Sequence, residues 1–260
     1  VSKRGKLMNL KGKNVLVFGA GRSGISAVRL LQKLDAAVVL YEENKNADME
    51  NFKDKINTGN NFREYFGSFP PDGLNDIDLM ILSPGISVEH PFVTTVKEKG
   101  IPVWGEIELA YRNSRGKIIA ITGTNGKTTT TSLTGEIMKS YFNEVFVAGN
   151  IGTPYSDIAL ETTEKSVSVI EVSSFQLETI YNFRPHISVI LNITPDHLDR
   201  HHNMDNYIRL KKEIAKNQNM EDLCILNYED SNARKISVQI NTRILYFSSE
   251  RPLKNGLYLD

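Results

Sequence analysis

The sequence predicts an α/β protein made of two domains, each built on a parallel β-sheet. Three observations carry this prediction. Short apolar runs rich in β-branched residues alternate with helical patterns, which is the order of a parallel sheet covered by helices. A polar stretch with a glycine, "RNSRGK" at 112–117, separates two such series. Each series begins with an apolar run that leads into a glycine-rich loop.

The predicted strands follow in order along the chain. In the first domain, residues 1–113, they lie at 14–19, 37–42, 78–83 and 101–105. In the second domain, residues 114–260, they lie at 117–122, 166–172, 186–194, 222–227 and 242–247. Ser23–Leu34 carries apolar residues at spacings of three, which predicts one buried helix face. The polar stretch 45–61 predicts a helix with a loop.

Composition excludes several classes of protein. The 260 residues are 40% hydrophobic, which is enough for ordinary cores. Lys+Arg and Asp+Glu balance at 31 each, so the charge indicates no nucleic-acid partner. Cys224 is the only cysteine, which excludes an intrachain disulfide. No apolar run approaches the ~20 residues of a membrane span. The basic start lacks an apolar signal core, so we expect a cytoplasmic location and no membrane insertion.

The stretch at 123–129, "GTNGKTT", lies between a predicted strand and a predicted helix with Leu133, Ile137, Met138 and Tyr141 along one side. Such a loop directs backbone N–H groups and a positive helix end at one point, which favours a phosphate. Lys127 would meet the terminal phosphates, and the Thr128 hydroxyl a Mg²⁺ ion. Ile121 stands where the usual motif has its first glycine, and an ordinary tight turn is the alternative. The residues of the predicted nucleotide site are Gly123, Thr124, Asn125, Gly126, Lys127, Thr128 and Thr129.

A second glycine loop, Gly19–Gly24, follows the first strand and matches G-x-G-x-x-G. Glu42 and Glu43 end the second strand, where a ribose-binding acid belongs in a dinucleotide site. Three readings stay open: a site for NAD, a site for another diphosphate ligand, and a loop that only packs its helix closely. The second is favoured, because such loops bind the pyrophosphates of many ligands.

Acidic and histidine side chains follow two strands of the second domain. Glu171 ends an otherwise apolar run in "VIEVSSFQLE", where it would hold Mg²⁺ or lie solvated at the strand end. His197, with Asp196 and Asp199 in "LNITPDHLDRHH", would serve a metal or a phosphoryl group. The two histidines that follow, at 201 and 202, are expected in a loop. Those at 90 and 186 are expected in exposed or capping positions.

Lys211 lies on a predicted helix face with Met204, Tyr207 and Ile214, at spacings of three and four. A bare buried lysine is costly. The side chain would therefore extend its amine to solvent, pair with an acid, or have its charge altered. The residues alone favour the first of these three.

Together these motifs resemble those of the Mur ligases of peptidoglycan synthesis. The loop "GTNGKTTTT" is shared by the wider superfamily, which includes folylpolyglutamate synthases. The stretches "GNIG" (149–152), "EVSSFQLE" (171–178), "LNITPDHLDRH" (191–201) and "ILSPGI" (81–86) are more specific, and resemble the members that add D-glutamate. The resemblance runs from about residue 9 to the end. It implies a Rossmann-like first domain that binds the UDP end of the substrate, followed by a P-loop-type α/β ATP-binding domain.

The resemblance also implies roles for single residues. Gly21, Arg22, Ser23, Gly24 and Ser83 would contact the uridine diphosphate. The residues near the muramoyl-alanine end of the substrate would be Asn150, Ser173 and Gln176. The magnesium ligands would be Thr128, Glu171, His197 and Lys211, with Lys211 carbamylated. The catalytic residues would be Lys127, His197 and Lys211.

The implied reaction uses ATP and Mg²⁺ to phosphorylate the carboxylate of UDP-N-acetylmuramoyl-L-alanine. The amine of D-glutamate then attacks the acyl phosphate, which forms an amide bond. The family has three domains, and this chain resembles the first and most of the second. We therefore expect a monomeric fragment with little ligation activity of its own, without the domain that contacts D-glutamate.

Three alternatives compete with this interpretation. The chain could belong to another amino-acid-adding ligase, such as the L-alanine or folylpolyglutamate enzyme. It could be an NAD-dependent oxidoreductase, which the first glycine loop and Glu42 favour but which leaves Gly123–Thr128 unexplained. It could also be a non-catalytic nucleotide-binding module. The combination of Glu171, His197 and Lys211 argues against the last.

Overall fold

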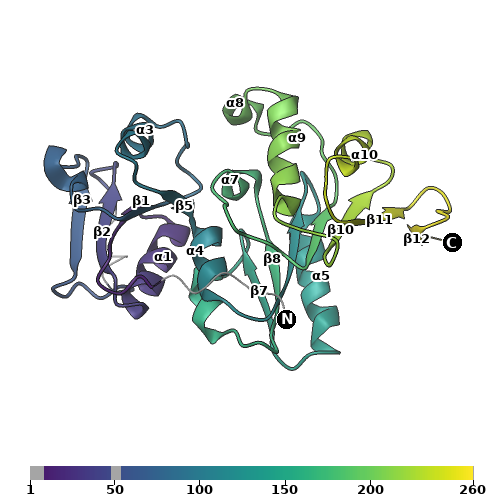
Figure 1. Cartoon of the computed structure of the whole chain (residues 1–260), viewed down its shortest axis with the longest axis horizontal. Coiled ribbons are helices and arrows are strands. Elements are labelled where there is room, and N and C mark those ends of the chain that lie inside the picture. The colour runs from purple at the N-terminus through teal and green to yellow at the C-terminus, as the bar shows by residue number, and fades with distance from the viewer. Residues whose placement is uncertain (1–8, 48–53, 260) are drawn as a thin grey trace. The chain divides into compact units, whose positions relative to one another are not determined.

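The computed structural model describes residues 9–47 and 54–259. The chain divides into two compact units (Figure 1). The first unit runs to Ser114 and adds two short later segments, Pro154–Glu161 and Thr179–Tyr181. The second unit contains Arg115–Thr153, Thr162–Glu178 and the chain from Asn182 onward. The sequence did not predict that the two short segments join the first unit.

The first unit is a parallel five-stranded sheet of order β3-β2-β1-β4-β5. Its strands are β1 (Asn14–Phe18), β2 (Ala37–Glu42), β3 (Phe62–Phe66), β4 (Leu79–Leu82) and β5 (Val103–Gly105). Its helices are α1 (Arg22–Lys33), η1 (Pro71–Leu74), α3 (Pro91–Glu98), α4 (Glu106–Asn113), α6 (Tyr155–Ile158) and η2 (Ala159–Glu161). Because the strand order turns back between β1 and β4, the loops after these two strands form the switch point where such sheets bind ligands.

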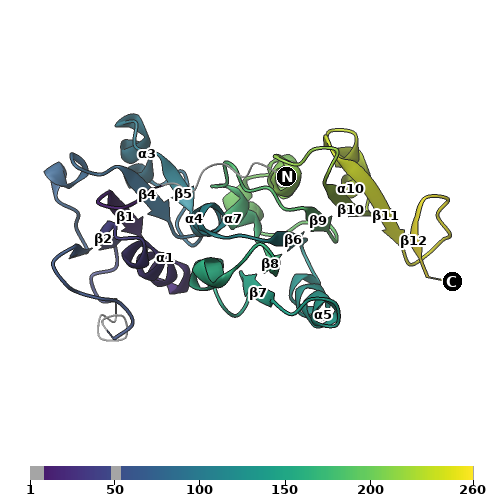
Figure 2. The same ribbon diagram turned by 60° about the horizontal axis from the view of Figure 1, so that its bottom comes forward.

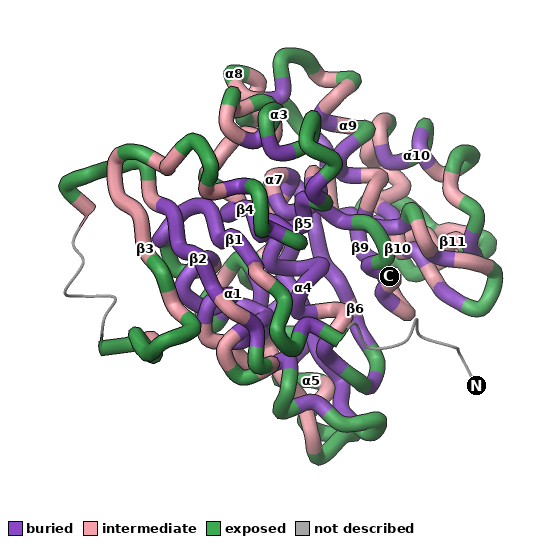
Figure 3. The backbone as a smooth tube through the Cα atoms, turned by 60° about the vertical axis from the view of Figure 1, so that its left-hand side comes forward, coloured by how far each residue is buried: buried purple, intermediate pink, exposed green. Residues whose placement is uncertain are grey.

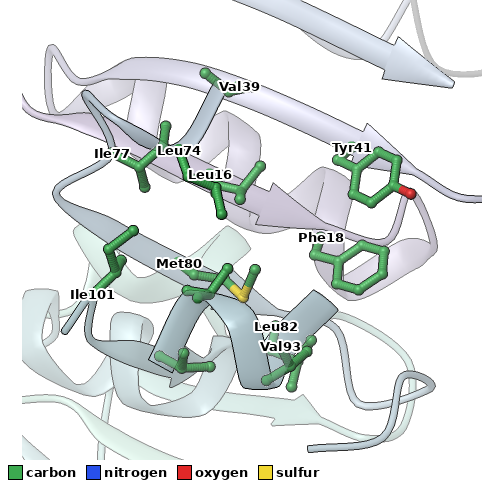
Figure 4. Close-up of a cluster of buried hydrophobic side chains, with 12 residues drawn as sticks. Leu16, Phe18, Val39, Tyr41, Leu74, Ile77, Met80, Leu82, Val93 and Ile101 are labelled. Carbon is green, nitrogen blue, oxygen red and sulfur yellow. The ribbon is translucent and has the colours of Figure 1, made fainter. Parts of the chain in front are cut away.

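Apolar side chains on one face of this sheet form a closed core (Figure 4). Leu16 and Phe18 alternate along β1, and Met80 and Leu82 alternate along β4, as expected for one face of a strand. The Phe18 and Tyr41 rings stack with centroids 4.8 Å apart. Figure 3 shows β1, β2 and β4 buried along most of their length, which is typical of parallel strands covered on both faces.

The second unit is a parallel seven-stranded sheet of order β12-β11-β10-β9-β6-β8-β7. Its strands are β6 (Lys117–Thr122), β7 (Val145–Gly149), β8 (Val167–Glu171), β9 (Ile187–Ile190), β10 (Leu223–Asn227), β11 (Arg243–Ser248) and β12 (Gly256–Tyr258). Its helices are α5 (Lys127–Lys139), α7 (Ser174–Leu177), α8 (Leu198–His201), α9 (Met204–Lys212), η3 (Glu213–Ala215) and α10 (Ser231–Ser237). The central strand β6 lies between β8 and β9, so the loops after these three strands meet at one edge.

The nine predicted strands are all present, and both sheets are parallel as expected. The sequence analysis missed β3, β7 and β12, which lie toward sheet edges. The described residues of the polar stretch, 45–47 and 54–61, contain no helix, and residues 48–53 lie outside the described part.

Helix α5 lies against β7 and β8 (Figure 2). It packs there through small residues, because Thr131 and Gly135 are its buried positions. The side that carries Leu133 and Ile137 is largely exposed, at 59% and 48%.

Candidate functional site

The loop after β6 has the backbone geometry that a phosphate site needs. Gly126 is the N-cap of α5 with φ of +79°, and Gly123 has φ of +158°, values that favour glycine. Two side-chain bonds brace the loop from the "LNIT" segment after β9. The backbone N–H of Asn125 donates to Asn192 Oδ1 at 2.8 Å, and Asn192 Nδ2 donates to the Asn125 carbonyl at 3.1 Å. The sequence analysis missed Asn192, although it lies in a motif that carried the resemblance.

Lys127 begins α5 and curls back over its own loop. Its Nζ donates to the carbonyl of Gly123 at 3.0 Å and to that of Thr124 at 2.7 Å. The ammonium group therefore lies on the loop and close to the amino end of α5. At that position its charge adds to the positive end of the helix dipole, so the loop attracts anions.

Glu171 lies at the same edge of the sheet as the loop. It ends β8, pairs in register with Ile121, and is only 1% exposed. Its Oε2 accepts from the Thr128 hydroxyl at 2.8 Å, and its Oε1 accepts from Asn150 Nδ2 at 2.8 Å. The structure thus brings Glu171, Thr128 and Asn150 together and excludes the solvated strand end as an explanation of Glu171.

A glycine next to Asn150 makes this approach possible. Gly149 has φ of +114°, and a Cβ there would lie 2.2 Å from the Glu171 carbonyl oxygen. Position 149 of the "GNIG" motif therefore requires glycine for steric reasons. Gly149 lets the strands approach, and Asn150 bonds the carboxylate.

The oxygen donors fit Mg²⁺. A hydroxyl and one carboxylate, Thr128 and Glu171, lie in contact beside the phosphate loop. Within the described ranges 9–47 and 54–259, no group of three or more His, Cys, Asp or Glu side chains lies close enough to hold a metal.

Lys211 is buried in the second unit, at 1% exposure. Its Nζ donates to the Thr122 hydroxyl at 3.1 Å and to the Gly123 carbonyl at 2.9 Å, both at the start of the phosphate loop. Burial lowers the pKa of Lys211 to about 7, and the nearby charge of Lys127 acts in the same direction. The expectation that this amine extends to solvent is wrong, because α9 directs it at the loop.

His197 lies at the start of α8 in a left-handed conformation, with φ of 50°. Its side chain is 51% exposed, and its Nε2 lies 3.5 Å from Asp196 Oδ2. Its ring contacts Phe175, with centroids 4.9 Å apart. It is therefore exposed, unlike the buried Glu171 and Lys211 of the predicted metal set.

Ser173 and Gln176 form a capping box at the start of α7. The Gln176 side chain accepts from the Ser173 N–H at 2.9 Å, and the Ser173 hydroxyl accepts from the Gln176 N–H at 3.3 Å. The structure therefore gives both residues a local role that the sequence analysis did not consider.

The other histidines have definite places. His201 is not a loop residue as expected: it ends α8, is 2% exposed and lies 3.0 Å from the Ser174 hydroxyl. Burial lowers the pKa of His201 to about 4. His90 caps α3 by accepting from the Phe92 N–H, which confirms its capping role.

The first glycine loop lies at the switch point of its own sheet. Gly21 is the N-cap of α1, with Arg22 exposed and Ser23 half-buried after it. Gly24 is buried, and a Cβ there would lie 1.9 Å from the Gly19 carbonyl oxygen. The Ser83 hydroxyl donates to that same carbonyl at 2.9 Å, so the loops after β1 and β4 are joined.

Glu42 has a structural role beside this loop. Its Oε2 accepts from the Ala20 N–H at 2.8 Å, and its Oε1 accepts from the Asn44 N–H at 2.9 Å. This carboxylate favoured a ribose site in the sequence analysis. In the structure it holds two backbone N–H groups, one in the first glycine loop and one just after β2.

Comparison with known proteins gives the same family for both units. Residues 121–255 match the Mur ligase middle domain, and residues 13–105 match the MurD-like N-terminal domain of Mur ligases. The chain is 52% identical over 252 residues to the UDP-N-acetylmuramoylalanine–D-glutamate ligase of Lachnoclostridium phytofermentans, and 49% identical over 254 residues to that of Lachnospira eligens. These alignments cover 97% of the chain and 56% of each relative. The chain thus spans about half the length of the curated relatives it matches.

A solved structure shares the fold. The UDP-N-acetylmuramate:L-alanyl-γ-D-glutamyl-meso-diaminopimelate ligase of Neisseria meningitides superposes with a TM-score of 0.62 at 15% identity, covering 94% of this chain and 82% of that one. In the part of this chain that the structure describes, no helix has the length and apolar character needed to cross a membrane.

Proposed function

The chain belongs to the Mur ligase family, and from this premise we propose that it carries the UDP-substrate and ATP sites of a ligase that adds D-glutamate to UDP-N-acetylmuramoyl-L-alanine. The observation that carries the proposal is the Thr128–Glu171–Asn150 cluster beside the phosphate loop. Its hydroxyl and carboxylate oxygens support a metal site beside the loop that would bind the ATP phosphates. The division into a UDP-substrate domain, 1–113, and an ATP domain, 114–260, is part of this proposal, as are a monomeric state and a cytoplasmic location.

The second unit would bind ATP through its loop. Backbone N–H groups of Gly123–Thr129 would bind the phosphates, and the Lys127 ammonium would move from the loop carbonyls to the terminal phosphate. Thr128, Glu171, His197 and Lys211 would hold Mg²⁺. When bound, Mg²⁺ offsets the negative charge that spreads over a transferring phosphoryl group.

The reaction requires two anions to meet. The substrate carboxylate and ATP repel one another, so Lys127 must neutralise charge and the loop must fix the geometry. The resulting acyl phosphate gives the D-glutamate amine an electrophile that a carboxylate does not offer. Asn150, Ser173 and Gln176 would lie near the muramoyl-alanine end. Of these, Asn150 is the one that bonds Glu171 directly.

Lys211 would act as a carbamate. Carbamylation needs a neutral amine, and the lowered pKa of Lys211, about 7, provides one near neutral pH. The added carboxylate would turn a buried cation into an anion able to reach the metal. Lys211→Ala should lose nucleotide-dependent chemistry in the ligase and regain part of it with a short carboxylic acid. A ¹³C-bicarbonate NMR signal assigned to Lys211 is the direct test, and its absence together with no rescue would contradict the carbamate.

The first unit would bind the UDP end of the substrate through Gly21–Gly24 and Ser83. Calorimetric titration of this chain with UDP-N-acetylmuramoyl-L-alanine tests this, with NADH and UMP as comparators. We expect the muramoyl substrate to bind more tightly than UMP, and NADH not to bind. Binding of NADH without any response to the UDP-sugar would favour the oxidoreductase alternative.

A further inference from the structure

A buried polar cluster in the second unit has no part in the proposed reaction. Ser174 begins α7, and its Oγ lies 3.0 Å from Nε2 of His201 at the end of α8. Nδ1 of His201 lies 3.5 Å from Oε1 of Glu178. The other oxygen of Glu178 accepts from Arg200 Nη2 at 2.7 Å. One neutral tautomer satisfies the imidazole, with Nδ1–H directed at Glu178 and Nε2 accepting from the Ser174 hydroxyl.

The imidazole ring fixed in this way contacts Tyr207. The two ring centroids are 5.3 Å apart and the planes lie 29° apart, a stacked arrangement. The His201 ring also contacts the Phe175 ring, with centroids 5.0 Å apart. Tyr207 is 1% exposed, so its orientation depends on these neighbours.

Tyr207 in turn contacts the phosphate loop. Its hydroxyl lies 3.1 Å from Thr124 Oγ1. The single hydroxyl hydrogen of Thr124 is donated to the Thr194 carbonyl at 3.0 Å, so Tyr207 is the donor in the pair. Lys211 Nζ lies 5.1 Å from the centre of the same ring. A single aromatic side chain thus separates His201 from both the loop and Lys211.

Core filling alone does not account for this cluster. An apolar side chain at 201 would fill the space without the buried Ser174 hydroxyl and the partly buried Glu178–Arg200 ion pair, all of which cost desolvation. Their bonds fix one rotamer and one tautomer of the ring. Because the Tyr207 ring stacks on this fixed imidazole, the position of the Tyr207 hydroxyl is restricted as well.

We propose that His201 is a positioning residue for the nucleotide site: the ring, bonded to Ser174 and lying beside Glu178, holds Tyr207, and the Tyr207 hydroxyl holds Thr124 in the loop conformation that binds phosphates. This proposal rests on the ATP-binding function proposed above. It assigns a role to Ser174, Glu178 and Arg200, which the sequence motifs contained but the reaction did not explain.

The test is a double-mutant cycle on this chain with Mg·ADP binding measured by calorimetry. His201→Gln removes the ring, and Tyr207→Phe removes the hydroxyl that bonds Thr124. Each single variant should weaken Mg·ADP binding about ten-fold, the order expected for losing one well-placed hydrogen bond. The double variant should bind no more weakly than the weaker single variant, because both changes interrupt one path. Multiplicative losses in the double variant would overturn the proposal.

Two further variants keep the test decisive if His201→Gln does not fold. Ser174→Ala removes only the hydroxyl that bonds Nε2, and should also weaken Mg·ADP binding. His202→Asn changes an exposed neighbouring histidine and should leave it unchanged. UDP-N-acetylmuramoyl-L-alanine binding to the first unit should be equal in all variants.

The two proposals fail in different ways. If the wild-type chain does not bind Mg·ADP, the ATP function is wrong and this inference with it. If the wild type binds and the His201→Gln and Ser174→Ala variants bind equally well, the inference alone is wrong.

Discussion

Glu171 and Glu106 are both buried carboxylates, and they differ in what their oxygens accept. Both oxygens of Glu171 are hydrogen-bonded, to Thr128 and to Asn150. In Glu106, Oε1 accepts from the Ser156 N–H, but Oε2 has no hydrogen-bond partner among the residues that the structure describes. Burial raises the pKa of Glu106 to about 7. The Glu171 carboxylate is stabilised by two hydrogen bonds, whereas the Glu106 carboxylate is costly to ionise.

Replacing Glu106 by Gln should therefore stabilise the chain above pH 7. Between pH 4.5 and about 7 the folded state holds a proton that the unfolded state has lost, so the stability of the wild type falls as pH rises. The gain should be on the order of 1–3 kcal/mol at pH 8 and small at pH 4. Thermal unfolding at both pH values measures it. Glu98→Gln, at an exposed position, is the control, and an equal gain at both pH values would contradict the explanation.

Lys127→Ala should remove binding of Mg·ATP while leaving binding of the UDP substrate nearly unchanged. The Lys127 ammonium donates to two carbonyls of the phosphate loop, whereas the UDP substrate would bind the first unit. We expect a loss of at least about ten-fold in Mg·ATP affinity, the effect of one charge-assisted bond. Calorimetry with both ligands measures it. Undiminished Mg·ATP binding would refute the role of Lys127.

At the scale of elements, α5 can approach β7 only because its facing residue is small. A Cβ at Gly135 would lie 2.3 Å from Val147 Cγ2. The sequence analysis noted the apolar residues on α5, but Leu133 and Ile137 are largely exposed. Helix α5 is thus held against β7 by close contact at a glycine rather than by a stripe of apolar side chains.

Gly135→Ala should destabilise the chain by about 1–3 kcal/mol, although alanine favours a helix, because overpacking outweighs propensity. Adding Val147→Ala should recover most of this loss, since the clash is with that side chain. Chemical denaturation of the two single variants and the double variant gives the coupling. Thr134→Ala on the same helix is the control. Additive losses would show that the clash is not the cause.

At the scale of the whole molecule, the two units should respond to different ligands. A ligand stabilises the unit that binds it by mass action. UDP-N-acetylmuramoyl-L-alanine should therefore slow amide hydrogen exchange in β1 and β4, and Mg·ATP should slow it in β6 and β8. Protection of the first sheet by Mg·ATP alone would contradict the assignment of ligands to units.

Much of this architecture was predictable from sequence. Strands such as Lys117–Thr122 were predicted to the residue, because buried parallel strands read as continuous β-branched runs. The chemistry of Gly123–Thr129 was predictable, because a phosphate loop is a local motif. β3, by contrast, is half-exposed and mixes charged with aromatic residues, so no such run marks it.

The sequence by itself determined the nine predicted strands, the two glycine loops and the family, since each depends on local pattern. Only the tertiary structure decided where long side chains go. Lys211 and His201 lie on predicted or short helical segments, and both are buried because α8 packs on α9 and α9 contacts the phosphate loop. Contacts such as Tyr207 with Thr124 join residues 83 positions apart. No local periodicity encodes such a pairing, because it depends on how the strands and helices are placed in three dimensions.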